Sequence, residues 1–151
     1  MGNVYLIPGL RMGPSSIKWI VDHASADLYD TKTDADRFTF REIVAHMADW
    51  EPILLSRMKQ TIDNPGSILT PIDEGQRAID LRYGETDPTV EATLWISLRE
   101  ATIRFLEENG PGNWEKSVVH PERGVQTLYD MANLELGHDA YHIEQLLHFL
   151  P

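Results

Sequence analysis

The 151-residue sequence has no cysteine and few basic residues. Without cysteine there can be no disulfide, no thiolate metal ligand and no cysteine nucleophile, so a metal ion would have to be held by histidine, carboxylate or water. The 13 lysines and arginines are scattered singly and are outnumbered by 24 acidic residues, which gives a formal net charge of -11. Nucleic acids and anionic membranes require a basic surface, so the sequence predicts neither as a partner.

Long hydrophobic runs and targeting signals are also missing. The first apolar run follows no basic leader and breaks at Pro8. No run approaches the roughly 20 apolar residues that a membrane-spanning helix needs. The lack of cysteine fits a reducing compartment. These features predict a soluble cytoplasmic protein, and its length predicts a single domain over residues 1–151.

Four segments repeat apolar residues at helical spacing, which predicts an all-α fold, an up-down four-helix bundle. Their expected starts are Pro14, Thr39, Asp87 and Thr127. Polar or glycine- and proline-rich segments at 31–36, 64–66 and 109–112 end the first three helices, and the fourth runs almost to the C-terminus. Thr39 and Thr127 each have an acid three residues later, the signature of a capping box, and Asp87 is followed by proline. The expected buried stripe of the third helix is Val90, Leu94, Leu98, Ala101 and Phe105.

The connections carry further signals. Residues 64–87 are long for a bundle loop, which predicts a short extra helix between the second and third helices. Asp73 is its expected cap, and the helix should run to Tyr83 and end at a left-handed Gly84. Residues 117–126 are expected to form a turn or small hairpin. Pro52 should kink or loosen the second helix, either opening a pocket or bending it around the core.

The stretch LGHDAYHIEQ places His138 and His142 four residues apart, on one face of the last helix. Their neighbours on that face are mostly apolar, so the pair should point inward. His46 lies on or beside the apolar stripe of the second helix, where it can supply a third ligand. His23, His120 and His148 fit such a site less well.

Three neutral histidines would leave a divalent ion at least one open position, the arrangement of a catalytic metal site. Imidazole-rich sites favour zinc and nickel. Asp49 and Glu135 each lie one helical turn from a candidate ligand, where they could orient an imidazole or a bound water. The alternative interpretations remain open: hydrogen-bonded core histidines without a metal, and solvated acids at helix edges.

The segments TFREIVAHMADWE and HPERGVQTLYDMANLELGHDAYHIEQL, with one histidine and then a distant histidine pair, resemble the DinB-like superfamily of metal-dependent helical-bundle proteins. The resemblance covers nearly the whole chain. It implies an up-down four-helix bundle, a divalent metal held by His46, His138 and His142, and a homodimer.

Relatives of known activity include thiol-dependent S-transferases and a mycothiol-dependent isomerase. The resemblance therefore implies a metal-dependent transferase or hydrolase of small molecules, with a low-molecular-weight thiol as a further cofactor. The sequence itself shows no basic pocket for an anionic thiol. A non-catalytic metal- or small-molecule-binding module of a stress response is the alternative function.

Overall fold

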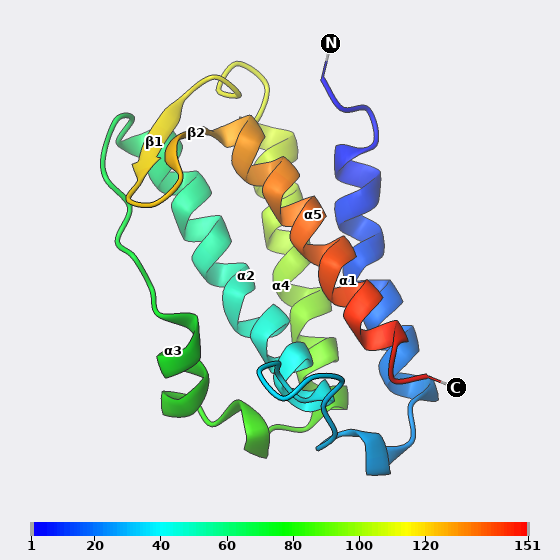
Figure 1. Cartoon of the computed structure of the whole chain (residues 1–151). Coiled ribbons are helices and arrows are strands. Elements are labelled where there is room, and N and C mark those ends of the chain that lie inside the picture. Colours follow the sequence, from blue (N-terminus) through cyan, green and yellow to red (C-terminus); the bar gives the residue numbers. More distant parts are fainter. Residues whose placement is uncertain (1, 151) are drawn as a thin grey trace.

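The computed structural model describes residues 2–150 and contains four long helices packed as a bundle (Figure 1). They are α1 (Leu6–His23), α2 (Phe40–Asp63), α4 (Pro88–Asn109) and α5 (Leu128–Leu147). The connection from α2 to α4 carries the short helix α3 (Glu74–Asp80). The four-helix bundle with an extra helix in this connection is thus confirmed. None of the helices within residues 2–150 combines the length and apolarity needed to cross a membrane.

Two pairs of helices lie diagonally across the bundle, α1 with α2 and α4 with α5, whereas α2 and α4 are neighbours. Both α1 and α2 pack against α4 and α5, so the chain crosses the bundle between α1 and α2 and again between α4 and α5. Figure 1 shows α1 and α5 running in one direction and α2 and α4 in the other. The long 64–87 connection makes this arrangement possible, because it returns the chain along α2 before α4 begins.

A two-stranded antiparallel hairpin precedes α5. It consists of β1 (Ser117–His120) and β2 (Gly124–Thr127). Backbone hydrogen bonds also tie β1 to the α2–α4 connection, from Leu69 N to Val119 O at 2.9 Å and from Val119 N to Ser67 O at 2.8 Å. The hairpin is therefore anchored against the bundle at the end where α5 starts.

The predicted helix starts after α1 are confirmed by their caps. Thr39 and Thr127 form capping boxes with Glu42 and Asp130, because each hydroxyl accepts from the third helical N–H while the acid accepts from the cap backbone. Asp87 accepts from two N–H groups at the start of α4. These short-range signals are local to the chain, which is why the sequence alone locates them.

The first helix begins at Leu6, so its expected start at Pro14 is wrong. Proline inside a helix leaves the carbonyl four residues earlier without its usual N–H partner. Here that carbonyl belongs to Leu10, and the guanidinium of Arg99 on α4 donates to it at 2.9 Å. A side chain from another helix thus satisfies the carbonyl that Pro14 leaves free, and α1 continues through the proline.

The expectation for the segment after the second helix also changes, whereas the bend expected at Pro52 stays a prediction. The short helix ends at Asp80, and Arg82, with φ 53°, takes the left-handed conformation in place of Gly84. Tyr83 is buried there and its hydroxyl donates to Asp49 at 2.6 Å, which draws the chain inward early. Pro52 lies on the exposed side of α2, which stays one continuous helix, so no break occurs there.

The expected buried stripe of α4 is wrong as well. Val90 and Leu94 are exposed, and the inward face instead carries polar groups beside apolar ones. The buried residues of α4 are Pro88, Ala92, Trp95, Arg99, Thr102, Ile103 and Leu106. An apolar stripe predicts the core face of a helix only when the charged side chains of that helix point to solvent. Arg99 instead points into the core, so the stripe misplaces the buried face.

Two large apolar clusters make up most of the core, with a polar layer between them, and a small third cluster joins α2 to α3 and Tyr83. One cluster gathers around Phe40, Met47 and Trp95 and the other around Leu10, Met58 and Leu106. Between them, at corresponding heights on the helices, lie four buried charged residues: Glu51, Arg99, Glu135 and Asp139.

Candidate metal centre

The structure brings together the three histidines selected from the sequence. His46 on α2 and His138 and His142 on α5 turn their Nε2 atoms toward one another. Nε2 of His138 lies 3.0 Å from Nε2 of His46 and 3.1 Å from Nε2 of His142. One ligand atom from each ring lies within 4.8 Å of the other two.

Aromatic side chains hold the His46 ring in place. Its centroid lies 5.5 Å from the Trp50 ring and 5.6 Å from the Phe38 ring, and Tyr83 lies on a further side at 6.5 Å. His46 is only 2% exposed, and its Nδ1 atom has no hydrogen-bond partner within residues 2–150. The ring is therefore fixed by packing and aims its Nε2 atom at the pair on α5.

Gln145 sets the hydrogen position on His142. Nδ1 of His142 lies 2.7 Å from the side-chain oxygen of Gln145, while the Gln145 amide nitrogen donates to the Tyr141 hydroxyl at 3.1 Å. An amide oxygen only accepts, so Nδ1 of a neutral His142 carries the hydrogen. Its Nε2 atom then presents a free lone pair to the cluster, which is the tautomer that a metal ion requires.

All three imidazoles are held neutral. Burial, followed by the nearby His142 and His138 rings, lowers the pKa of His46 from 6.5 to about 2. Burial also lowers the pKa of His138 to about 3 and that of His142 to about 4. Neutral imidazole is the ligand form, so at pH 7 the cluster needs to lose no proton before it can bind an ion.

The cluster fits a metal site on its own geometry. A tetrahedral ion with metal–nitrogen bonds of 2.0–2.1 Å keeps its ligand nitrogens roughly 3.3 Å apart. The Nε2 separations of 3.0 and 3.1 Å lie close to that spacing. Three neutral rings offer too few hydrogens to pair all the nitrogens that meet here, so a shared cation explains their convergence better than hydrogen bonding does.

The two acids expected to support the ligands have other contacts. Asp49 accepts from Arg77, including Nη2 at 2.7 Å, and from Tyr83. Glu135 is fully buried and its Oε1 atom lies 3.0 Å from Nη2 of Arg99. Neither acid has a hydrogen bond to one of the three histidines among residues 2–150.

The remaining histidines stay apart from the cluster. His23 is exposed and stacks on Trp19, and His148 is exposed and pairs with Glu144. His120, whose placement the sequence did not indicate, is buried at the end of β1.

The polar layer behind the cluster is built on Arg99. Its Nε atom donates to both carboxylate oxygens of Glu51 at 2.9 Å, and its Nη2 atom donates to Asp139 at 3.0 Å. Thr102 and Trp95 donate to Glu51 as well. Three acids thus share one guanidinium in a buried layer.

The environment of this layer raises the pKa of two of its carboxyl groups, those of Glu135 and Asp139. Burial and the nearby Glu51 raise the pKa of Glu135 well above its usual value. Burial also raises the pKa of Asp139 to about 6, although Arg99 opposes the shift. Three buried carboxyl groups and one guanidinium thus lie next to the histidine cluster, and burial raises the pKa of two of the three carboxyl groups.

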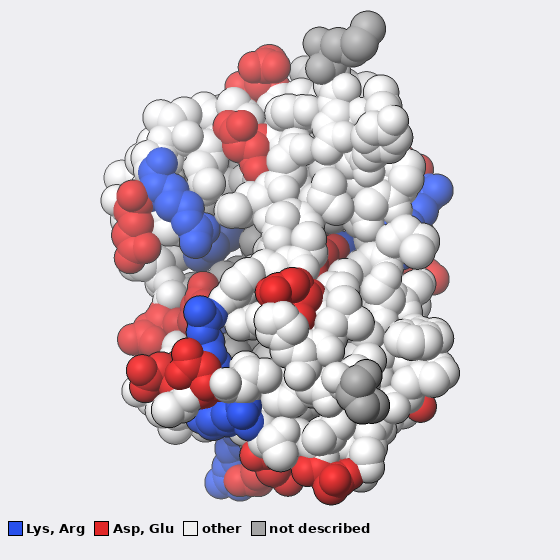
Figure 2. Space-filling model, turned by 45° about the vertical axis from the view of Figure 1, so that its right-hand side comes forward, with Lys and Arg blue, Asp and Glu red and all other residues white. Residues whose placement is uncertain are grey.

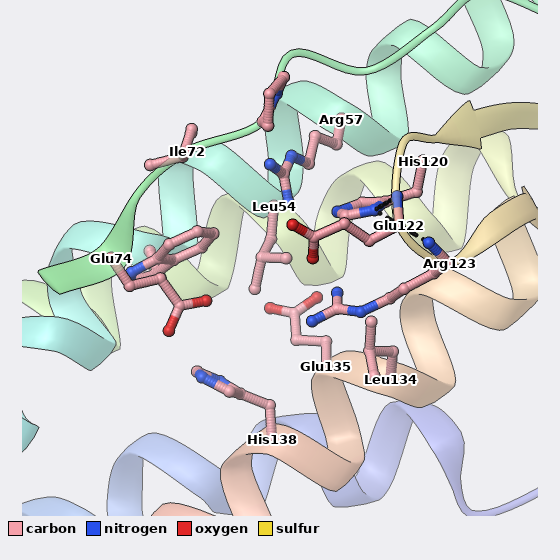
Figure 3. Close-up of a pocket in the computed structure, with 12 residues that line it drawn as sticks. Leu54, Arg57, Ile72, Glu74, His120, Glu122, Arg123, Leu134, Glu135 and His138 are labelled. Carbon is pink, nitrogen blue, oxygen red and sulfur yellow. Dashed lines mark hydrogen bonds between the residues drawn. The ribbon is translucent and has the colours of Figure 1, made fainter. Parts of the chain in front are cut away.

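A pocket opens beside the cluster, with His138 and Glu135 in its wall (Figure 3). The side chains around it come from α2, from the start of α3, from the hairpin turn and from α5. Arg57 and Arg123 both direct their guanidinium groups into it (Figure 3). The sequence did not reveal Arg57, Arg123 or Arg99, because only the tertiary fold brings them to the site, and the role of Gln145 was also missed. The available signal for Gln145 was its spacing: it follows His142 by three residues on the same helix, where the two side chains can meet.

The four-helix bundle and the three converging histidines place this chain among helical-bundle proteins with a site that fits a metal ion. A model of the DinB superfamily matches residues 10–146, and the chain belongs to that superfamily. Among curated proteins it is similar to one from Oceanobacillus iheyensis named "Putative metal-dependent hydrolase", at 22% identity over 133 residues, which are 88% of this chain and 77% of that protein.

The fold is also similar to a solved structure. YfiT from Bacillus subtilis, described as a probable metal-dependent hydrolase with an unusual four-helix bundle topology, superposes with a TM-score of 0.89 at 21% identity. The match covers 95% of this chain and 83% of YfiT. The diagonal order of the helices described above is thus shared with a known fold.

Proposed function

We propose that this protein is a metal-dependent hydrolase of small molecules, in which His46, His138 and His142 hold one zinc or nickel ion. The observation that carries the proposal is the convergence of three neutral imidazole Nε2 atoms beside a pocket. The names of the two similar proteins agree with it. A divalent ion on three histidines supplies an open position at which water becomes acidic and a carbonyl is polarised.

The residues of the chain supply the surroundings. Gln145 keeps the hydrogen of His142 on Nδ1, so that Nε2 stays free. Glu135 lines the pocket, where its Oε1 atom lies 3.0 Å from the Arg99 guanidinium but neither carboxyl oxygen makes a well-aligned hydrogen bond within residues 2–150. Burial raises the pKa of Glu135, and we assign this carboxyl group to hydrogen bonding with the substrate or with water.

Metal analysis and a hydrolysis screen test the proposal. Protein prepared without a histidine tag should contain about one zinc or nickel per chain, and it should hydrolyse at least one ester or amide of a small-molecule panel. A chelator should abolish that activity and the metal should restore it. A protein that binds metal but hydrolyses nothing in the panel would favour the alternative, a non-catalytic binding module.

A thiol-dependent transferase is the second candidate. The cationic side of the pocket, with Arg57 and Arg123, would suit a low-molecular-weight thiol that carries a negative charge. Adding a low-molecular-weight thiol to the same panel separates the two. Turnover only in the presence of the thiol identifies the transferase, and turnover in its absence identifies the hydrolase.

Metal affinity should change little between pH 7 and pH 5.5. The pKa values of about 2, 3 and 4 keep all three imidazoles neutral in this range, so protons do not compete with the metal. Three histidines with pKa values near 6.5 would instead weaken binding roughly several-hundred-fold. Calorimetric titration with zinc at both pH values measures this, with circular dichroism to verify folding. A hundredfold loss by a folded protein would contradict the prediction.

A homodimer remains a proposal. The face formed by α1 and α5 carries few charged side chains in Figure 2, and it exposes Met12, Trp19 and Leu147 around a shallow depression. A second copy of the chain would cover these apolar groups. Sedimentation velocity at micromolar concentration should give twice the 17.2 kDa mass of one chain.

A further inference from the structure

Two arginines line the pocket without an ion pair. Arg57 comes from α2 and Arg123 from the turn of the hairpin, and both face the space beside His138 (Figure 3). Glu74 and Glu122 also line the pocket, but across residues 2–150 no carboxylate oxygen lies within 4.0 Å of either guanidinium.

Five of the other seven arginines within residues 2–150 form such pairs, and neither Arg37 nor Arg104, the two that do not, lines this pocket. The ion pairs are Arg11–Glu107, Arg41–Asp30, Arg77–Asp49, Arg82–Glu85 and Arg99 with its three acids. In a chain with 24 acids and a net charge of -11, carboxylates are plentiful. Two neighbouring cations left unpaired at a pocket therefore indicate that an anion from outside the chain completes the site.

The pKa shifts around Arg57 and Arg123 also indicate positive charge that the chain itself does not balance. Burial lowers the pKa of Arg57, and the charge of Arg123 lowers it further, whereas Glu74 only partly opposes these effects. Burial and then the charges of Arg123 and Arg57 lower the pKa of His120. The three side chains therefore lie close enough for a positive charge on one to disfavour a positive charge on another. A bound anion would relieve that repulsion.

The guanidinium of Arg57 and the backbone of Arg123 are held in position. The guanidinium of Arg57 lies 5.5 Å from the Trp50 ring centroid and donates to the carbonyl of Thr70 at 3.2 Å. In the hairpin turn, Nδ1 of His120 accepts from the backbone N–H of Glu122 at 3.2 Å and of Arg123 at 3.4 Å. Because the hairpin is itself bonded to the α2–α4 connection, the start of the Arg123 side chain is fixed before any ligand arrives.

We propose that Arg57 and Arg123 bind an anionic group of the substrate, a carboxylate or a phosphate, and thereby place its reacting end at the three-histidine centre. This inference rests on the proposed function, because it makes the pocket the substrate site of the same reaction. It narrows the substrate class to small molecules that carry a negative charge at one end and the reacting bond or thiol at the other.

Cobalt-loaded protein and two matched thiols test this. The thiolate absorption band of cobalt reports when sulfur binds, and 3-mercaptopropionate differs from 3-mercaptopropionamide essentially in its charge. The wild type should bind the acid roughly tenfold more tightly than the amide. Arg57→Gln and Arg123→Gln should each remove most of this preference, whereas Arg104→Gln, an exposed arginine on α4, should keep it. Equal affinities for the two thiols in the wild type would overturn the proposal.

A second measurement works without a metal. Inorganic phosphate added to metal-free protein should shift the ring signals of His120 in NMR spectra, and the shift should vanish in Arg123→Gln. Arg123→Lys, which keeps the charge but not the paired donors, should bind phosphate with intermediate affinity. If cobalt does not bind but phosphate does, the proposed function fails while the anion site stands. If phosphate binds equally well to the wild type and Arg123→Gln, the anion site fails.

Discussion

Replacing Arg99 by methionine is expected to lower the free energy of unfolding by on the order of 3–5 kcal/mol. The methionine fills much of the same volume but supplies no donor. Glu51, Glu135 and Asp139 would then remain buried without the cation that all three contact. The Leu10 carbonyl, which Pro14 leaves free, would lose its partner as well. Removing one member of a buried ionic cluster costs far more than the cluster gains in net stability, because unpaired charge stays in the core.

Urea unfolding followed by circular dichroism measures this effect. Arg104→Met is the matched control, because Arg104 lies on the same helix and is exposed. Adding Glu51→Gln and Asp139→Asn to Arg99→Met should restore part of the lost stability, since these changes remove buried charge. Unfolding midpoints that agree for Arg99→Met and Arg104→Met would show that the polar layer does not depend on its arginine.

Replacing His46 by glutamine is expected to abolish stabilisation by metal. A ligand that binds only the folded state adds about 4 kcal/mol at a free concentration a thousand times its dissociation constant. Wild-type protein should gain a stabilisation of that order with excess zinc. The variant should gain almost none, because His46 is the only one of the three converging ligands that comes from α2. Two histidines from one helix rarely hold zinc alone.

Thermal unfolding with and without zinc gives the result. His148→Gln serves as the control, since His148 is exposed at the end of α5 and should leave the response to zinc intact. If His46→Gln keeps the full zinc response, the proposed ligand set is wrong. If both the wild type and His148→Gln fail to respond, the cluster does not bind zinc under these conditions, and nickel should be tested in the same way.

Much of the fold could be predicted because its signals are local. Thr39, Asp87 and Thr127 each lie within three residues of the N–H groups that they cap. The histidine cluster was also within reach, because His138 and His142 share a helix face and His46 lies on an inward stripe. In each case the spacing within one helix carries the information.

The errors share one physical cause, which is a polar group satisfied by a distant partner. By local rules Pro14 marks the first turn of a helix, and its place inside α1 depends on Arg99, 85 residues later, which donates to the carbonyl that Pro14 leaves free. The inward face of α4 was missed because an arginine normally marks the solvent side of a helix. Arg57 and Arg123 are 66 residues apart and meet only at the pocket. Such pairings leave no periodic trace in the sequence.

Arg99 also fixes how far each helix can slide along its neighbours. Its guanidinium binds Glu51 on α2, Asp139 on α5 and the Leu10 carbonyl on α1, so that a shift of any helix by one turn would break a buried contact. Glu51 lies five residues after His46, and Asp139 directly follows His138. One arginine that touches none of the histidines therefore sets the axial alignment at which rings from two helices arrive at the same level.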